Sequence, residues 1–128
     1  NRNLYIDNKA TYPWLLQKKS KASINPNRNI RIGCSAARTN IVISPTGEVY
    51  PCPFLHQFSA GNLRENKLVE IWNHAESFSL FRRLTTNKIS GKCKSCEYIP
   101  YECQGGCRAA AFVKSNNFFA EDPICWKT

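Results

Sequence analysis

The sequence predicts a small, irregular α+β domain that is held together as much by bound metal as by apolar packing. Three observations support this. Four cysteines fall within the fifteen residues from Cys93 to Cys107, a hairpin pattern precedes them, and the remaining apolar patterns are short. With 128 residues the chain is long enough for one domain with a modest core. Small domains often need a metal or another cross-link in addition to that core.

A β-hairpin is predicted over residues 39–52. Thr39 to Ile43 ends in three consecutive β-branched residues, which favour a strand, and Glu48 to Cys52 is its expected partner. Ser44-Pro45-Thr46-Gly47 between them is a turn, because proline presets its first central angle and glycine closes it. We expect this hairpin to bring Cys34, just before the first strand, towards Cys52.

Short helices are predicted on both sides of the cysteine-rich segment. Asn66 is a plausible N-cap for a helix whose apolar face would be Leu68, Ile71, Trp72 and Ala75. A second helix would place Phe78, Phe81 and Leu84 on one face, with Arg82 and Arg83 outside. Residues 87–92 are expected to form a loop, and residues 108–113 an alanine-rich helix that ends near Asn116.

The basic residues are concentrated at the start of the chain. Residues 1–38 contain eight basic residues and one acidic residue, whereas residues 39–128 contain ten and eight. This distribution favours a solvated linker over a nucleic-acid-binding arm, so nucleic acid is not an expected partner. Within the linker, Trp14, Leu15 and Leu16 after Tyr12-Pro13 could begin a short helix that ends near residue 21.

The seven cysteines allow three kinds of cross-link. Disulfides suit short secreted chains with an even cysteine count, but seven is odd and no signal peptide is visible. Structural zinc usually needs two C-x2-C knuckles, and only Cys93 and Cys96 form one. Iron–sulfur clusters are bound by cysteine thiolates in runs of short spacings, and one cysteine of such a run can ligate another cluster. Seven thiols would fill one four-iron cluster and supply three ligands to a second.

The pattern resembles the SPASM domain, the auxiliary iron–sulfur domain at the C-terminus of many radical S-adenosylmethionine (SAM) enzymes. The family pattern is a cysteine, a spacer, Gly-x4-Cys, then Cys-x2-Cys-x5-Cys-x3-Cys and a final cysteine. The segments ISPTGEVYPCPF, GNLRENKLVEIW, CEYIPYECQGGCRA and EDPIC match as well. One departure is the six residues, not five, between Cys96 and Cys103, which implies a small bulge. The matching positions are Cys34, Gly47, Cys52, Cys93, Cys96, Cys103, Cys107 and Cys125.

The resemblance implies two clusters, each of the 4Fe–4S type. Cys93, Cys96, Cys103 and Cys125 would ligate one, and Cys34, Cys52 and Cys107 the other. The three-thiol cluster would then have an open iron, an exogenous ligand, or a non-cysteine ligand such as His56. Backbone amides around Gly105, Gly106 and Arg108 are expected to donate hydrogen bonds to cluster sulfurs.

The resemblance also implies a domain division and a function. Residues 1–31 would be a linker or the remnant of a preceding radical SAM barrel, and residues 32–128 the SPASM domain. The absence of methionine, also at position 1, is what a segment of a longer protein would show. The SAM-cleaving motif Cys-x3-Cys-x2-Cys is not in this sequence, so we do not expect the chain alone to be an active enzyme. SAM would act only through the parent domain.

The expected role is therefore auxiliary. The oxygen-sensitive clusters would relay electrons and help to position a peptide or small-molecule substrate of a peptide maturase or of an enzyme of cofactor or tetrapyrrole biosynthesis. The alternative function is a zinc-binding protein-interaction module, motivated by the single C-x2-C knuckle. Cysteines without a signal peptide favour the cytoplasm, and no apolar run is long enough to predict a transmembrane helix.

Overall fold

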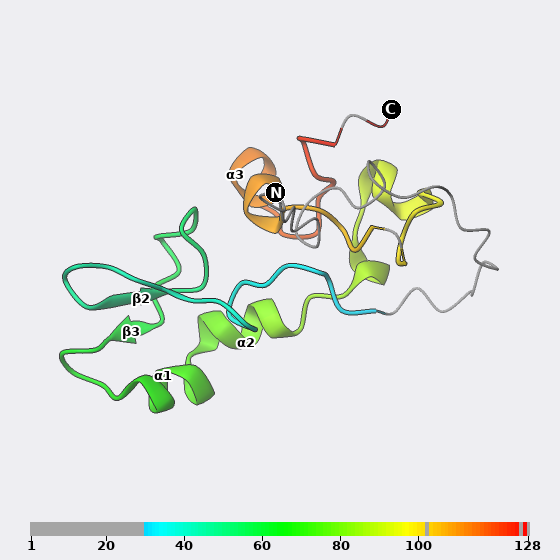
Figure 1. Cartoon of the computed structure of the whole chain (residues 1–128). Helices are drawn as coiled ribbons and strands as arrows, with labels where there is room; N and C mark the ends of the chain where they lie inside the picture. The colour runs from blue at the N-terminus through cyan, green and yellow to red at the C-terminus, as the bar shows by residue number, and fades with distance from the viewer. Residues whose placement is uncertain (1–29, 102, 126, 128) are drawn as a thin grey trace, which may run out of the picture. The chain divides into compact units, whose positions relative to one another are not determined.

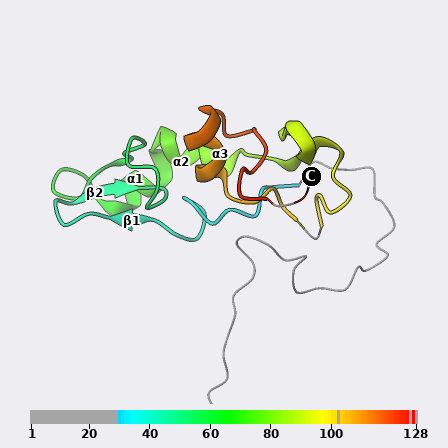
Figure 2. The ribbon, with the colours of Figure 1, turned by 90° about the horizontal axis from the view of Figure 1, so that it is seen from above.

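The fold is taken from a computed structural model, which describes residues 30–101, 103–125 and 127. The predicted short helix after Trp14, and most of the basic segment, lie outside the described residues. The chain divides into two compact units. Unit 1 comprises Asn1–Cys34 and Thr85–Thr128, and unit 2 comprises Ser35–Leu84. Figures 1 and 2 show the ribbon from two directions.

The predicted hairpin is confirmed in unit 2, with shorter strands. β1 (Val42–Ile43) pairs antiparallel with β2 (Glu48–Tyr50), and Ile43 lies opposite Val49. β1 starts late because residues 38–40 turn back on Ser35, whose carbonyl accepts all three amides at 3.0–3.2 Å. β2 is followed by Pro51, which has no N–H to continue the ladder.

The turn between these strands has the predicted chemistry. The Gly47 amide donates to the Ser44 carbonyl at 2.9 Å, and the φ of Gly47 is +91°. Glycine adopts this angle without the steric penalty that a Cβ imposes.

The sheet has a third strand that the sequence did not predict. β3 (Gly61–Asn62) pairs antiparallel with β2, so the strand order is β1-β2-β3 (Figure 1). The Asn62 side chain donates to a Glu48 carboxylate oxygen at 3.0 Å, and the Ala60 amide donates to the Val49 carbonyl at 2.7 Å. A two-residue Gly-Asn strand has no β-propensity, so these contacts rather than residue preference form it.

Both predicted helices of unit 2 are present. α1 (Leu68–His74) begins after Lys67, so the prediction of Asn66 as its N-cap is wrong; the Asn66 amide instead closes a turn onto the Asn62 carbonyl at 2.9 Å. Of the predicted apolar face of α1, Ile71 is buried whereas Leu68 is 42% exposed. α2 (Glu76–Arg82) follows directly. The buried apolar residues of unit 2 include Val49, Leu55, Ile71, Phe78, Phe81 and Leu84.

The prediction that Arg82 points outwards is wrong, because its side chain contacts other parts of unit 2. Its guanidinium donates to the carbonyls of Ala37 at 2.8 Å and Trp72 at 2.7 Å. It also lies 4.5 Å from the centre of the Trp72 ring, a cation–π distance. Arg83 is exposed, as predicted.

Unit 1 contains short helical segments. The segment predicted as a loop over 87–92 overlaps two 3₁₀ helices, η2 (Thr86–Lys88) and η3 (Gly91–Ser95). The predicted alanine-rich helix is confirmed as α3 (Arg108–Ser115), and it ends at Asn116, whose left-handed φ is +53°. The buried apolar residues of unit 1 include Ile32, Ile89, Ile99, Ala109, Ala111 and Phe118.

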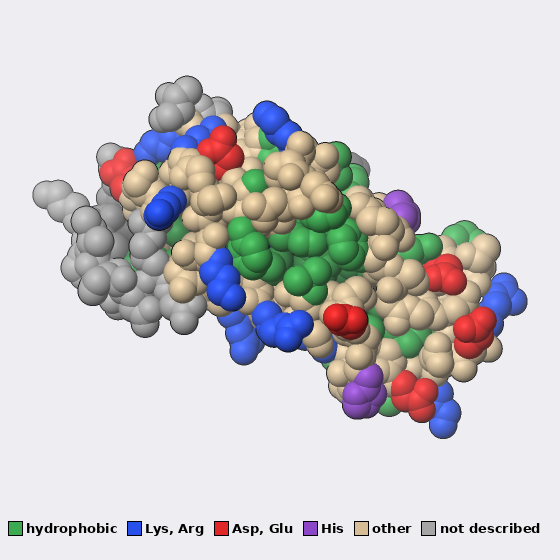
Figure 3. All heavy atoms as spheres, turned by 180° about the vertical axis from the view of Figure 1, so that it is seen from behind, with side chains coloured by type: hydrophobic (Ala, Val, Ile, Leu, Met, Phe, Trp, Pro, Cys, Tyr) green, Lys and Arg blue, Asp and Glu red, His purple; other side chains and the backbone are tan. Residues whose placement is uncertain are grey.

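The described surface mixes residue types. On the face in Figure 3, Lys and Arg side chains are interspersed with Asp and Glu around a group of hydrophobic side chains. Within the described residues, none of the helices combines the length and the apolar character that crossing a membrane requires.

Candidate metal centre

Four of the predicted ligands gather in unit 1. Cys93 and Cys103 are each 7% exposed, and Cys96 and Cys125 are half-buried. The Cys103 thiol interacts electrostatically with the thiols of Cys93, Cys96 and Cys125, and the Cys93 thiol interacts with those of Cys96 and Cys125. Cys103 is therefore within electrostatic reach of the other three sulfurs, although 32 positions separate Cys93 from Cys125 in sequence. No disulfide joins any of the seven cysteines, all of which are among the described residues.

Local backbone geometry places these thiols. η3 carries Cys93, and the Cys96 amide closes its end onto the Cys93 carbonyl at 3.3 Å. The Cys103 amide donates to the Tyr98 carbonyl at 2.8 Å, which folds the segment between Cys96 and Cys103 back on itself. This segment holds the extra residue relative to the family spacing.

Lys92 ties the C-terminal cysteine to this segment. Its ammonium group donates to the Cys125 carbonyl at 2.9 Å, and its backbone amide donates to the Glu121 carboxylate at 2.7 Å. These two bonds hold the returning chain against η3.

Burial sets the protonation of the inner thiols. Burial raises the pKa of Cys103 to about 11, against the opposing effect of a hydrogen bond from the Gly105 amide. Burial also raises the pKa of Cys93, opposed by the Asp122 amide and by the charge of Arg108. Thiols with raised pKa values are protonated at neutral pH, so a metal that binds them must displace protons.

The space beside the thiols suits a group larger than a single ion. A cavity of about 420 Å³ is bordered by Cys93, Cys96 and Cys125 together with Lys92 and Lys127. Among the residues that the structure describes, no three His, Cys, Asp or Glu side chains converge closely enough to hold one metal ion. An iron–sulfur cluster spreads its thiolates around several metal atoms, and an all-thiol donor set is the set that such clusters use.

Cys34 and Cys107, which also belong to unit 1, both lie near the positive charge of Arg108. Both thiols interact electrostatically with the guanidinium of Arg108. The Cys107 sulfur accepts the Ala110 amide at 3.4 Å at the start of α3. The Gly33 amide donates to the Gln104 carbonyl at 3.1 Å, which anchors the segment before Cys34 to the cysteine-rich segment.

Cys52 lies in unit 2, where its carbonyl accepts the Leu55 amide just after β2. Its approach to Cys34 and Cys107 stays a prediction. His56, the candidate non-cysteine ligand, is exposed and packs edge-on against Tyr50, with ring centres 5.0 Å apart.

The two glycines before Cys107 adopt backbone angles that other residues rarely reach. The φ values of Gly105 and Gly106 are +102° and +65°. A Cβ at Gly105 would lie 2.5 Å from the Ile89 side chain, and one at Gly106 would overlap Asp122. The Gly105 amide donates to the sulfur of Cys103, and hydrogen bonds from these amides to cluster sulfurs stay a prediction.

Sequence reasoning missed two side chains at this centre. Arg108 is 0% exposed and Asp122 is 2% exposed. The Asp122 carboxylate accepts the amide of Cys107 at 2.8 Å and that of Ile124 at 2.9 Å. It therefore holds the backbone at Cys107 and directly before Cys125, both of which are proposed ligands. Charged residues are rarely buried, and the only sequence signal was that each lies close to a cysteine.

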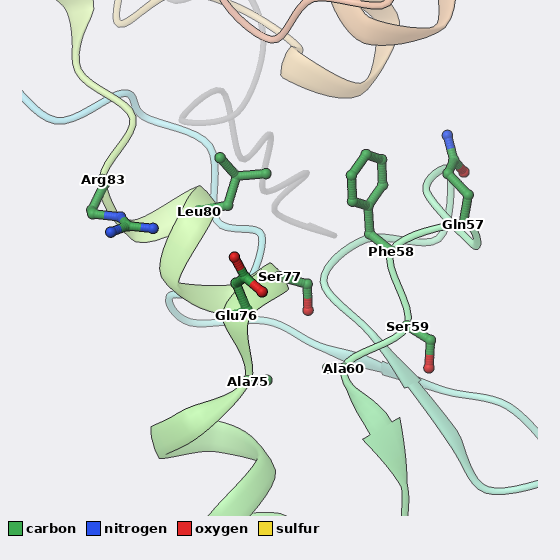
Figure 4. A pocket seen from close by; sticks show the side chains of 9 residues that line it. All are labelled: Gln57, Phe58, Ser59, Ala60, Ala75, Glu76, Ser77, Leu80 and Arg83. Carbon is green, nitrogen blue, oxygen red and sulfur yellow. The ribbon is translucent and has the colours of Figure 1, made fainter.

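Unit 2 has a cavity of its own, of about 430 Å³. In Figure 4, Phe58 and Leu80 lie on opposite sides of it, with Glu76 and Arg83 on the helical side. None of the seven cysteines lines it.

Comparisons with known proteins identify an iron–sulfur cluster-binding family. Residues 34–97, half of the chain, match the SPASM family, described as an iron–sulfur cluster-binding domain. The chain is 41% identical over 93 residues to an AdoMet-dependent heme synthase of Oleidesulfovibrio alaskensis, covering 73% of this chain and 23% of that protein. It is 40% identical over 95 residues to the mycofactocin maturase MftC of Mycolicibacterium smegmatis, covering 72% and 23%.

A further relative is the PqqA peptide cyclase of Xanthomonas campestris pv. campestris, 34% identical over 92 residues, covering 70% of this chain and 24% of that protein. The chain thus spans about a quarter of the length of the curated relatives it matches. On the family match and on the order of its cysteines, this chain belongs to the SPASM family, the iron–sulfur cluster-binding domain of radical SAM enzymes.

Proposed function

We propose that this chain carries two auxiliary 4Fe–4S clusters within a radical SAM enzyme. The observation that carries the proposal is the electrostatic interaction among four thiols of unit 1, those of Cys93, Cys96, Cys103 and Cys125. All of them except Cys103 border one cavity. Four thiolates are the full ligand set of one such cluster. Membership of an iron–sulfur cluster-binding family supports the same assignment.

The second cluster would be bound by Cys34, Cys52 and Cys107. This assignment follows the order of cysteines in the family pattern. It is supported by the position of Cys34 and Cys107 around the same guanidinium. The fourth ligand would come from outside this cysteine set, with His56 as one candidate.

The proposed role is auxiliary to chemistry on the parent protein. The clusters, when bound, supply sites that accept or relay one electron at a time. The chain's own residues would bind the clusters, exclude water from Cys93 and Cys103 by burial, and help to position the substrate. The relatives are named as an AdoMet-dependent heme synthase, a mycofactocin maturase and a PqqA peptide cyclase, which supports a peptide or a tetrapyrrole as the substrate class. The domain division at residues 31–32 and a cytoplasmic location are part of the same proposal.

Anaerobic reconstitution tests the proposal. After reconstitution with iron and sulfide, we expect about eight irons and eight sulfides per chain, with Mössbauer parameters of 4Fe–4S clusters. Fewer than four irons per chain would refute the two-cluster assignment. Colourless protein purified anaerobically with stoichiometric zinc would instead favour the zinc-binding interaction module.

A further inference from the structure

The most deeply buried charge in the described part of the chain belongs to a residue outside the proposed ligand set. Arg108 is the first residue of α3, directly after Cys107, and it is 0% exposed. A guanidinium in this environment has lost its hydration, which is costly unless other groups compensate. The identity of those groups therefore indicates what the residue does.

Backbone carbonyls hold the guanidinium in place. One terminal nitrogen donates to the carbonyls of Phe118 at 3.0 Å and Ala120 at 2.7 Å, and the other donates to the carbonyl of Gly105. These bonds connect the segments before and after α3, and they hold the guanidinium in one position. Carbonyl oxygens are dipoles, however, and do not neutralise a full positive charge.

The titratable groups around Arg108 are mostly cysteines, which carry negative charge once they bind a metal. The Arg108 guanidinium interacts electrostatically with Cys93, Asp122, Cys107 and Cys34, in that order of strength. Cys93 belongs to the proposed four-thiol set, and Cys107 and Cys34 belong to the three-thiol set. One fixed cation thus acts on members of both sets.

One donor of this group is unused. The Nε–H of Arg108 is buried and has no hydrogen-bond partner among the residues that the structure describes. A buried donor without a partner is unfavourable, whereas a sulfur that carries negative charge would accept its hydrogen bond. Bound, anionic sulfur would accept a hydrogen bond from the unused donor and would add to the charge compensation that Asp122 provides.

We propose that Arg108 raises the reduction potential of the iron–sulfur clusters by holding a fixed positive charge beside both thiol sets. The inference rests on the proposed function. Reduction adds one negative charge to a cluster, and a nearby buried cation stabilises the reduced state more than the oxidised state.

The test is redox titration of the full-length protein, reconstituted anaerobically and monitored by electron paramagnetic resonance. Arg108→Gln removes the charge and keeps amide donors for the carbonyls. At a fixed applied potential we expect at least a tenfold lower ratio of reduced to oxidised cluster, a shift of about 59 mV to lower potential for a one-electron couple. Arg108→Lys keeps the charge and should restore a potential close to that of the wild type.

Two further variants make the result specific. Lys114→Gln removes an equal charge from the exposed last turn of the same helix and should leave the potential unchanged. Asp122→Asn removes the carboxylate beside Arg108 and keeps an acceptor oxygen, so it should shift the potential upwards. If Arg108→Gln does not load iron, the Asp122→Asn variant provides the test. An unchanged reduction potential in Asp122→Asn would overturn the inference.

The outcomes separate this inference from the proposed function. A wild-type protein that binds no iron refutes the proposed function itself. A wild-type protein that loads normally, with an Arg108→Gln variant of equal iron content and equal potential, refutes only the role of Arg108. A Lys114→Gln shift as large as that of Arg108→Gln would likewise refute a local effect.

Discussion

Individual cysteines are expected to contribute unequally, because the four-thiol set lies within unit 1 whereas Cys52 lies in unit 2. Cys96→Ala should remove the four-thiol cluster and largely unfold residues 93–125, since metal binding and folding are coupled. Cys52→Ala should remove only the other cluster. Iron counting and Mössbauer spectra of the two variants measure this difference. Identical spectra would contradict the ligand assignment.

Replacement of Gly106 by alanine should disturb the proposed metal centre. Its φ of +65° is strained for alanine, and the new Cβ would lie 3.0 Å from the Cβ and Cγ of Asp122. Asp122 has no free direction to move in, because it is buried and accepts the amides of Cys107 and Ile124. We expect Gly106→Ala to cost about 1–3 kcal/mol in the free energy of unfolding and to lower the iron content.

A strain-matched variant in unit 2 provides the control for Gly106→Ala. Gly61 has a φ of +136°, and a Cβ there would lie 3.3 Å from Ile71. Gly61→Ala should also destabilise the protein, as measured by denaturant unfolding, but should keep the four irons of the four-thiol set. Equal loss of iron in both variants would show that general destabilisation, not the Asp122 contact, is responsible.

At the scale of elements, one carboxylate holds the short third strand. Glu48 on β2 accepts the Ser59 hydroxyl at 2.5 Å and the Asn62 amide nitrogen at 3.0 Å. The hydrogen bond from Ser59, and then that from Asn62, hold the pKa of Glu48 below its usual value. A lowered folded-state pKa means that the ionised form stabilises the fold. This contribution is present above the unfolded-state pKa and is lost as the pH falls through the folded-state pKa.

Amide hydrogen exchange measures this contribution of Glu48 locally. The Ala60 and Leu63 amides, which donate to Val49 and Gly47, should lose protection as the pH falls below about 5, after correction for intrinsic rates. Glu48→Gln should reduce protection at neutral pH and make it less dependent on pH. A wild-type profile that stays flat over this range would contradict the assignment.

The same elements show why sequence predicted part of the fold. The hairpin and α3 were predictable because their signals are local: a Pro-Thr-Gly turn, and alanines that end at an Asn able to adopt a left-handed φ. β3 was not, because Gly61 and Asn62 have no strand preference and pair only through contacts with distant residues. The start of α1 was misplaced for the same reason, since Asn66 closes a tertiary turn instead of capping the helix.

At the scale of the whole molecule, sequence indicated the ligands better than their surroundings. The resemblance to the SPASM pattern implied one ligand set of four thiols, and the structure shows electrostatic interactions among these thiols in unit 1. They carried no information on Arg108 and Asp122, whose burial depends on carbonyls and amides supplied by residues 105–124. Polar networks of this kind depend on three-dimensional convergence, which a linear pattern does not encode.

The two units should respond differently to metal removal. Unit 2 has a three-stranded sheet, two helices and a core of large apolar residues that includes Phe78 and Phe81. Unit 1 has short helical segments, and its buried residues include Arg108, Asp122 and two of the proposed ligands. Without clusters, these polar groups stay buried but have fewer favourable interactions to offset the cost of burial. Unit 1 should therefore depend on metal for its stability.

Hydrogen exchange before and after anaerobic chelation of iron tests this dependence. We expect the amides of residues 86–125 to exchange at least about tenfold faster in the metal-free protein, a loss of about 1.4 kcal/mol or more in local stability. Amides of α1 and α2 should change less. Faster exchange of equal size in both units would indicate that they unfold together, and unchanged exchange in unit 1 would show that clusters do not stabilise it.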